Sequence, residues 1–397
     1  TGQFVRNKAL RYWIDNKGVN KYDLNKYCRV IAKEFDFANK LNSTARQSSA
    51  ERAWSGIARF FDNCRKKIKG KKGFPKFKKH SRSVEYKQSG WKLDETTKKH
   101  ITFTDKNNIG RVKLVGSRDI YYYGADLIKR VRLVRRADGY YCQFCISVEE
   151  KEVLEPTGKA IGLDMGLKYF YADSFGHTEE NPKFYRKSER KLNTLGRRLS
   201  RKYRNSNKGV KGKLMKKNPK TRQSNNYHKA RVAKAKQHLK VSRQRKDHAV
   251  KLARCVCASN DCIVYEDLSV RNLVKNRKLS KSISDAGWTQ FRDWVEYFGW
   301  KMGKITVAVP PHYTSQDCPK CDRRVKKSLS TRTHVCECGY VADRDVASAI
   351  KILQKGLNTV GHTGIYAWGD LPSWAIGATL SSNGESLNQE PRSQTRI

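Results

Sequence analysis

Residues 160–166 read Ala160-Ile161-Gly162-Leu163-Asp164-Met165-Gly166, in which an apolar run leads to the carboxylate of Asp164 and Gly166 lies two residues further on. A second apolar run, Cys262-Ile263-Val264-Tyr265-Glu266, also ends in a carboxylate. Short apolar runs of this kind are typical of buried strands. Asp345 is a third carboxylate, and it begins a helical pattern that continues to Ile350. Two Mg²⁺ ions at a phosphodiester need several shared anionic oxygens, which separate strand ends and helix starts can supply together.

Each of these carboxylates also has a simpler explanation as a surface residue or a helix cap, because Asp and Glu are common. Asp343 cannot be told from Asp345 by composition alone. Their setting favours a metal-binding role for the three residues, since Asp164 and Glu266 end apolar strands and Asp345 follows a cysteine cluster. In a chain as basic as this one, the trio indicates a nuclease.

The sequence from residue 159 onward alternates strands with helices, which predicts an α/β fold. The predicted strands cover residues 159–164, 168–173, 262–266 and 305–309. The predicted helices lie near residues 184–204, 224–257 and 284–302. Strands around a central sheet with helical insertions fit a ribonuclease-H-type core.

The first 150 residues divide into a helical part and a β part. Residues 1–70 read as helices, and the clearest covers 43–68. Its apolar residues recur at helical spacing and predict a core-facing stripe: Ala50, Trp54, Ile57, Phe61, Cys64 and Ile68. Residues 100–150 change to period two and predict a small antiparallel β-domain.

Four cysteines form a pattern that predicts a structural zinc site. Cys318 and Cys321 form a CxxC pair, and fourteen residues later Cys336 and Cys338 form a CxC pair followed by Gly339. Tetrahedral Zn²⁺ takes such paired thiolates, and four protein ligands leave no position open for water. The alternative is four unligated thiols in a polar loop, which is a poor structural solution.

The other cysteines do not make a second site of this kind. Cys142 and Cys145 lie within a predicted strand with no second pair nearby, so we interpret them as packing residues. Cys255, Cys257 and Cys262 lie at a helix-to-strand junction, where burial is the better interpretation. Eleven cysteines, an odd number, argue against a secreted disulfide scaffold and favour a reducing cytoplasm.

The net charge is +47, from 84 Lys and Arg against 37 Asp and Glu. Repulsion on this scale favours a polyanionic partner, and nucleic acid is the leading candidate. Ten basic residues and no acid lie between Arg65 and Arg82, and 26 basic residues lie between Arg186 and Arg254. An isolated charge run is usually a solvated helix face, but two large runs interleaved with aromatics favour binding to a phosphate backbone.

The remaining features concern location and the chain ends. No apolar stretch approaches membrane-spanning length and no signal peptide opens the chain, so we expect no membrane partner and a cytoplasmic, nucleoid-associated protein. Thr1 stands where a Met is expected, which suggests that the natural N-terminus is missing. Residues 356–397 are rich in Gly, Ser and Asn and are predicted to be disordered.

Several motifs together resemble TnpB, the family of RNA-guided DNA endonucleases of insertion-sequence transposons that is related to type V CRISPR effectors. The resemblance covers roughly residues 1–355. It is carried by the following segments: Gly2-Gln3-Phe4-Val5-Arg6-Asn7, Gly73-Phe74-Pro75-Lys76-Phe77-Lys78, Gly162-Leu163-Asp164-Met165-Gly166, Ser282-Ile283-Ser284-Asp285-Ala286-Gly287-Trp288, and the cysteine ribbon that ends in Asp343-Arg344-Asp345.

The resemblance implies a domain organisation. Residues 1–70 would be a helical recognition domain and residues 71–158 mostly a β-barrel wedge domain, with part of the barrel's first strand absent. Residues 159–355 would be a RuvC nuclease domain that contains the basic helices and a zinc ribbon at residues 312–342. The CxC pair departs from the commoner CxxC of the family.

The resemblance also implies a mechanism. Asp164, Glu266 and Asp345 would be the catalytic acids that hold two Mg²⁺, with the Asp-x-x-x-Ala-x-x-Ile pattern favouring Asp345 over Asp343. A guide RNA would bind the basic helices and the barrel, and the protein would recognise a short motif beside the double-stranded DNA target.

Three other readings remain. A miniature type V CRISPR effector differs only in its genomic neighbourhood. A guide-dependent DNA-binding regulator would lack one or more of the acids, and this chain has all three. A strand transposase needs a Tyr or Ser nucleophile, and no such setting stands out.

Overall fold

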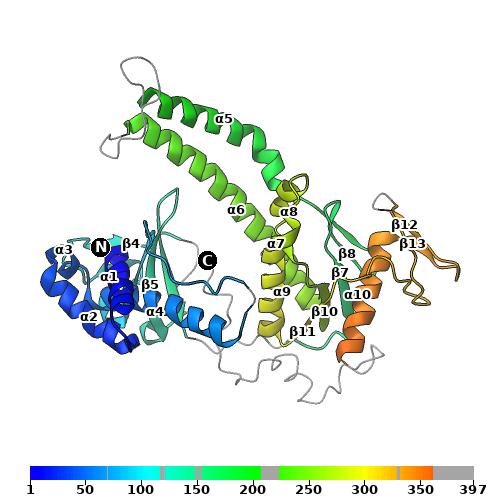
Figure 1. The fold of residues 1–397 in the computed structure, drawn as a ribbon, viewed down its shortest axis with the longest axis horizontal. Coiled ribbons are helices and arrows are strands. Elements are labelled where there is room, and N and C mark those ends of the chain that lie inside the picture. The colour runs from blue at the N-terminus through cyan, green and yellow to red at the C-terminus, as the bar shows by residue number, and fades with distance from the viewer. Residues whose placement is uncertain are drawn as a thin grey trace. The chain divides into compact units, whose positions relative to one another are not determined.

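A computed structural model describes residues 1–68, 70–116, 120, 122–147, 152, 154–206, 223–328 and 331–360 (Figure 1). The chain divides into two compact units, Thr1–Glu149 and Glu150–Ile397. The sequence predicts disorder for residues 356–397. Residues 356–360 are helical, and residues 361–397 lie outside the described residues.

The first unit begins with helices α1 (Gly2–Asp15), α2 (Lys21–Glu34), α3 (Asp36–Asn39) and α4 (Ser43–Arg65). Asn20 caps α2 by accepting hydrogen bonds from the backbone of Tyr22 and Asp23. The helices share one core, formed by the following buried residues: Val5, Ala9, Leu10, Leu24, Cys28, Ile31, Ala38, Ala50, Ala53 and Ile57.

The apolar stripe predicted along α4 is buried only in its first half. Ala50 and Ile57 are fully buried, and Trp54 packs against the same core. Phe61 is 47% exposed, Cys64 is exposed, and Ile68 lies beyond the end of the helix. The prediction that the whole stripe is core is therefore wrong, because the core that α4 shares with α1 and α2 ends at Ile57.

The rest of the first unit forms two antiparallel sheets. One has the order β1 (Ser83–Lys87), β5 (Ile128–Arg135), β6 (Tyr140–Ile146), and the other has the order β2 (Trp91–Leu93), β3 (His100–Phe103), β4 (Arg111–Lys113). Short 3₁₀ turns cover Gln88–Gly90 and Ala125–Leu127. The antiparallel β-domain predicted for residues 100–150 is confirmed, but it recruits two earlier strands that the sequence pattern did not predict.

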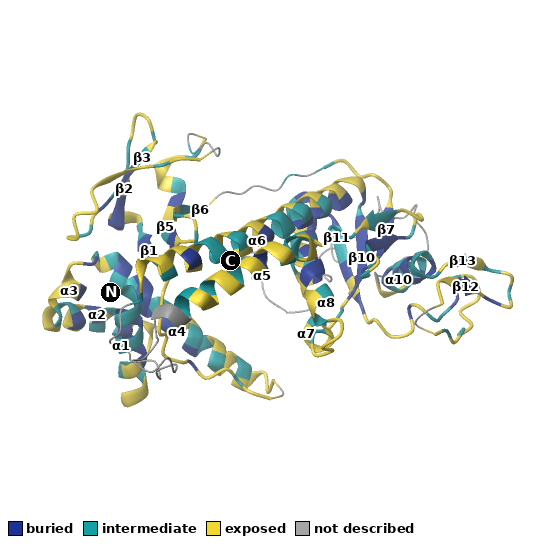
Figure 2. Ribbon diagram, turned by 90° about the horizontal axis from the view of Figure 1, so that it is seen from above, coloured by how far each residue is buried: buried dark blue, intermediate teal, exposed yellow. Residues whose placement is uncertain are grey.

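The second unit is built on a five-stranded sheet with the order β11-β10-β7-β8-β9. Its strands are β7 (Ala160–Asp164), β8 (Tyr169–Asp173), β9 (Thr178–Glu180), β10 (Cys262–Glu266) and β11 (Ile305–Val309). β7, β8 and β9 form an antiparallel meander, whereas β10 is parallel to both β7 and β11. The inner strands β7 and β10 are buried on both faces, which explains their continuous apolar sequences (Figure 2).

Helices cover both faces of this sheet. Alternate residues such as Ile161 and Ile263 pack against α6 (Asn225–Ser259) and α9 (Trp288–Met302) on one face. The intervening residues of each strand, such as Cys262 and Val264, point to the other face and pack against Ile352 of α10 (Arg344–Val360). The alternation follows from the period of two in a strand.

Two glycines allow α10 to lie unusually close to the sheet. A Cβ on Gly162 of β7 would be 2.2 Å from the carbonyl oxygen of Ala349 and 2.8 Å from Cβ of Leu353. A Cβ on Gly356 of α10 would be 2.4 Å from Cγ1 of Val264. Any side chain at either glycine would force the helix away from the strands that carry Asp164 and Glu266.

The remaining helices of this unit are α5 (Phe184–Ser206), α7 (Val270–Leu273) and α8 (Ser280–Ala286). α5 and α6 lie side by side as a long pair that extends beyond the sheet (Figure 1). The short strands β12 (Thr333–Val335) and β13 (Val341–Asp343) pair within the cysteine segment. Among the residues that the structure describes, no helix is long and apolar enough to cross a membrane.

The cysteines outside the predicted zinc site differ in burial. Cys257 and Cys262 are buried, and Cys142 packs against the β-sheet core of the first unit. Cys145 and Cys255 are exposed. The packing interpretation is therefore wrong for these two, because Cys145 lies on the outer face of β6 and Cys255 on the outer face of α6.

Candidate active site

Asp164 and Glu266 lie at the carboxyl ends of neighbouring parallel strands. Leu163 pairs with Tyr265, so the two carboxylates follow immediately and occupy the same position along β7 and β10. Side chains alternate between the two faces of a strand, and Asp164 and Glu266 fall on the same face as the residues that pack against α10. The predicted strand ends are thus confirmed, and one face of the sheet carries both acids.

Helix α10 brings the third acid to this face. Asp345 lies in its first turn, and its side chain is 18% exposed. Ser348, one turn further along the helix and 2% exposed, donates a hydrogen bond to Asp164. Residues three apart lie on the same side of a helix, so Asp345 and Ser348 both face β7.

Asp343 has a different environment. It is the residue just before α10, and its carboxylate accepts a hydrogen bond from the backbone N–H of Asp345 at 2.8 Å. This is the geometry of a helix N-cap, which satisfies one of the free N–H groups of the first turn. The side chain of Asp345 remains available to the interior face of the helix.

The three carboxylates repel one another. The pKa of Asp164 is raised to about 8, first by burial and then by the charges of Glu266 and Asp345. Burial also raises the pKa of Glu266, which is only 7% exposed. Three converging acids with little solvent are typical of a site that holds a divalent cation, because the cation supplies the missing positive charge.

Nearby groups partly offset this repulsion. Arg332 lies 3.8 Å and Arg344 lies 3.4 Å from the carboxylate of Asp345. Lys355 of α10 lowers the pKa of Glu266 through its charge, after the larger effect of a hydrogen bond from Thr314. Thr314 is 3% exposed, and its hydroxyl donates to Oε1 of Glu266.

Sequence reasoning missed Ser348 and Thr314. Ser348 could have been found from its spacing, because it follows Asp345 by three residues in a predicted helix. Thr314 gives no such signal, since it lies 48 residues from Glu266 in the chain and outside any regular element.

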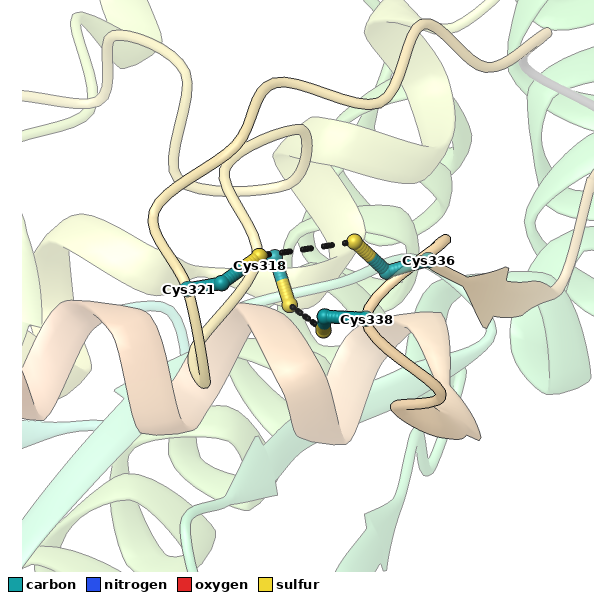
Figure 3. Close-up of side chains that lie close together, drawn as sticks. All are labelled: Cys318, Cys321, Cys336 and Cys338. Carbon is teal, nitrogen blue, oxygen red and sulfur yellow. Dashed lines mark hydrogen bonds between the residues drawn. The ribbon is translucent and has the colours of Figure 1, made fainter.

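The four predicted zinc cysteines lie together (Figure 3). Sγ of Cys318 is 3.6 Å from Sγ of Cys338, and Sγ of Cys321 is 3.6 Å from Sγ of Cys336. All four sulfur atoms lie within 4.8 Å of one another. Tetrahedral zinc with Zn–S bonds of about 2.3 Å requires sulfur separations of about 3.8 Å, so this cluster fits a zinc ion.

The basic helices α5 and α6 are a separate candidate functional feature of the second unit. α5 carries nine Lys and Arg and one acid, Glu189. Most basic side chains on its described part are exposed or half-buried. Asp285, which is 4% exposed, fixes the base of the pair: it accepts hydrogen bonds from the backbone of Tyr185 at 2.8 Å and Arg186 at 3.1 Å, and from Nη2 of Arg245 in α6 at 2.8 Å.

The fold and site define a two-unit α/β protein with a carboxylate centre, a cysteine ribbon and a basic helical pair. Residues 143–277 match a family described as a probable transposase (OrfB_IS605), and residues 288–352 match the TNB domain of Cas12f1-like proteins. The fold is similar to that of Cas12f1 in a cryo-EM structure of its complex with sgRNA and target DNA. The TM-score is 0.52 at 13% identity, over 88% of this chain and 80% of that one.

Individual relatives agree with these family matches. A candidate RNA-guided DNA endonuclease of Streptomyces pristinaespiralis is 36% identical over 203 residues, which is 51% of this chain and 46% of the relative. A second, named InsQ, from Escherichia coli strain K12, is 27% identical over 337 residues, or 80% of this chain and 73% of the relative. The matched part thus spans about half of the first relative and three quarters of the second. The resemblance predicted from the motifs is confirmed.

Proposed function

We propose that this protein is an RNA-guided DNA endonuclease of the TnpB type. The observation that carries the proposal is the convergence of Asp164, Glu266 and Asp345 on the α10 face of the sheet. The names of the two relatives support it, since both are candidate RNA-guided DNA endonucleases. The basic balance of the chain supports a nucleic-acid partner.

The nuclease domain is proposed to be a RuvC core. An antiparallel meander of three strands, followed by two strands parallel to the first, is the strand arrangement of ribonuclease-H-type folds and supports this assignment. We further propose that residues 1–70 form the recognition domain, residues 71–158 the wedge domain with its β-barrel, and residues 159–355 the nuclease domain with the ribbon.

Asp164, Glu266 and Asp345 would hold two Mg²⁺ ions. The residues fit such ions because three elements each supply a carboxylate, and oxygen is the ligand that Mg²⁺ prefers. The carboxylates lie close enough that burial and the two neighbours raise the pKa of Asp164 to about 8. When bound, such ions activate water and stabilise the leaving oxygen of a phosphodiester. Ser348 and Thr314 would orient the carboxylates of Asp164 and Glu266.

The other parts have separate roles in this proposal. The α5/α6 pair would bind the phosphates of the guide RNA, which base-pairs with one strand of the target DNA. Cys318, Cys321, Cys336 and Cys338 would bind a structural Zn²⁺, since four thiolates leave no coordination position for substrate. The structure of the zinc segment would then depend on the metal.

A second candidate is a miniature type V CRISPR effector, which the similarity to the Cas12f1 fold and TNB domain favours. The two candidates share one chemistry and differ in the source of the guide. A guide-dependent regulator without cleavage is less consistent with three converging acids.

The experiment is to purify the full chain and sequence the RNA bound to it. We expect one dominant RNA species, encoded next to the gene at the transposon end, whereas repeat-derived RNA would favour the CRISPR candidate. Reversing the charges of Arg197, Arg198 and Arg201 on α5 should weaken RNA binding and reduce its salt dependence. The matched control reverses three exposed basic residues of α2, which are Lys26, Arg29 and Lys33. Purified protein that binds no defined RNA would contradict the proposal.

A further inference from the structure

Thr314 connects the cysteine ribbon to the carboxylate centre. It lies between the end of β11 at Val309 and the first cysteine pair, and it is 3% exposed. Its hydroxyl donates a hydrogen bond to Oε1 of Glu266. Burial raises the pKa of Glu266, and the same hydrogen bond lowers it against that larger effect.

The turn that carries Thr314 belongs to the ribbon. Tyr313 adopts a left-handed backbone conformation with φ of 64°, and its carbonyl oxygen accepts hydrogen bonds from the N–H groups of Gln316 and Asp317, both at 2.9 Å. The guanidinium of Arg324, which follows the first cysteine pair, lies 3.5 Å from the centre of the Tyr313 ring. Residues on both sides of that pair therefore fix the position of Thr314.

The same ribbon is attached to α10. The side-chain amide of Gln354 donates to the carbonyl of Pro319 at 2.8 Å, and Lys355 donates to the carbonyl of His312 at 2.7 Å. Lys351, which is 7% exposed, pairs with Asp322. Pro319 lies within the first cysteine pair, and Asp322 directly follows it, so the position of α10 depends on the local structure of that pair.

We propose that Thr314 is a positioning residue for Glu266, and that the cysteine ribbon orients the carboxylates of the nuclease centre. This inference rests on the proposed function, because it assigns Glu266 to a divalent-metal site. A hydrogen bond to Oε1 restrains the rotation of the carboxylate, and Glu266 falls on the same face as the strand residues that pack against α10. Residues that orient a metal ligand in this way typically contribute about 10-fold to 100-fold in metal affinity or activity.

A purely structural role for Thr314 makes a different prediction. Its hydroxyl also lies 3.4 Å from the carbonyl of Pro311, and its methyl group fills space in the buried turn. If filling that space were its role, Thr314→Val would be tolerated and Thr314→Ser would not. If the hydroxyl orients Glu266, the order is reversed.

The test measures Mn²⁺ binding to the full chain by electron paramagnetic resonance, with Mn²⁺ as the probe for the Mg²⁺ site. Thr314→Val should weaken the Asp164-dependent binding about tenfold. Thr314→Ser should remain within about twofold of the unmodified protein. Thr333→Val is the matched control, because Thr333 is an exposed residue of the same ribbon. Zinc content and thermal midpoint are measured for every variant.

The outcomes separate the inference from the proposed function. Unchanged Mn²⁺ binding in Thr314→Val, or equal losses in the Val and Ser variants, would overturn the inference even if the protein cleaves DNA. A loss of Mn²⁺ binding confined to Thr314→Val would support it even if no cleavage is found. If Thr314→Val loses zinc, Thr314→Ala is compared with Thr314→Ser, because these two variants differ only in the hydroxyl. Weaker Mn²⁺ binding in the Ala variant than in the Ser variant would support the inference, and equal binding would overturn it.

Discussion

The carboxylate of Asp343 accepts a hydrogen bond from the backbone N–H of Asp345 at 2.8 Å. The two aspartates are separated by one residue, yet they face different environments. Asp343 is exposed and caps α10, whereas Asp345 lies in the first helical turn and interacts with Asp164. This difference decides which of them can join the carboxylate centre.

Replacing Asp345 by Ala should abolish DNA cleavage, because the centre would lose one of its three acids. Replacing Asp343 by Asn should retain cleavage, because Asn also caps helices, and Asp343→Ala should cost about 1 kcal/mol of stability. Cleavage rates under saturating guide RNA, together with thermal midpoints, measure both effects. Full cleavage by Asp345→Ala beside an inactive Asp343→Asn would show that the other aspartate is the ligand.

Asp164→Asn should stabilise the metal-free protein while it eliminates activity. Burial and the charges of Glu266 and Asp345 raise the pKa of Asp164 to about 8 in the folded protein, whereas the unfolded side chain is ionised above about pH 4. At pH 7 folding must therefore protonate Asp164, and the neutral amide of Asn removes this cost. We expect the thermal midpoint in EDTA to rise by roughly 2 °C or more. Added Mg²⁺ should raise the midpoint of the unmodified protein and not that of the variant. A variant that is less stable in EDTA than the unmodified protein would contradict the proposed repulsion among the three carboxylates.

The purified protein should contain one Zn²⁺ per chain, and the double variant Cys318→Ser/Cys321→Ser should contain none. Elemental analysis measures this directly. The variant should also lose protection from hydrogen exchange around the ribbon, because zinc binding and local folding share one free energy. Cys145→Ser/Cys255→Ser is the control, since both cysteines are exposed and lie outside the cluster. A zinc-free protein with full activity would refute the assignment.

Asp285→Ala should release the base of the α5/α6 pair. Asp285 is 4% exposed and accepts hydrogen bonds from Arg245 and from the first turn of α5, so its loss leaves a partly buried guanidinium unpaired. We expect a cost of about 3 kcal/mol, seen as faster hydrogen exchange in the first turn of α5. Asp247→Ala, which removes only an exposed pair with Lys251, should cost about 0.5 kcal/mol or less. Equal effects of the two changes would argue against an anchoring role.

The central sheet was predictable because its strands are short, apolar and end in carboxylates. The period of two in β7 and β10 also determines that Asp164 and Glu266 share a face. The approach of α10 was not predictable in the same way, since Gly162 and Gly356 reveal their role only when helix and strand are placed together.

Other features were predicted wrongly or missed, because a sequence pattern does not show the packing that decides them. Helical spacing in α4 continues past Ile57, but the shared core ends there, so Phe61 became exposed. β1 has the charged residues Glu85 and Lys87, and β2 has only three residues, so neither resembles an isolated strand. Thr314 contacts Glu266 from 48 residues away in the chain, and no local signal in one sequence identifies such a contact.

The most direct test of the proposed function is cleavage of a double-stranded DNA that matches the bound guide RNA. We predict that the protein with its guide RNA and Mg²⁺ cleaves this duplex, and that Asp164→Ala binds it with similar affinity and does not cleave it. Cleavage should also stop when Mg²⁺ is chelated or when the bases beside the recognition motif are mismatched to the guide. Efficient cleavage of the same duplex by RNA-free protein would contradict guided cleavage and leave an ordinary metal-dependent nuclease in its place.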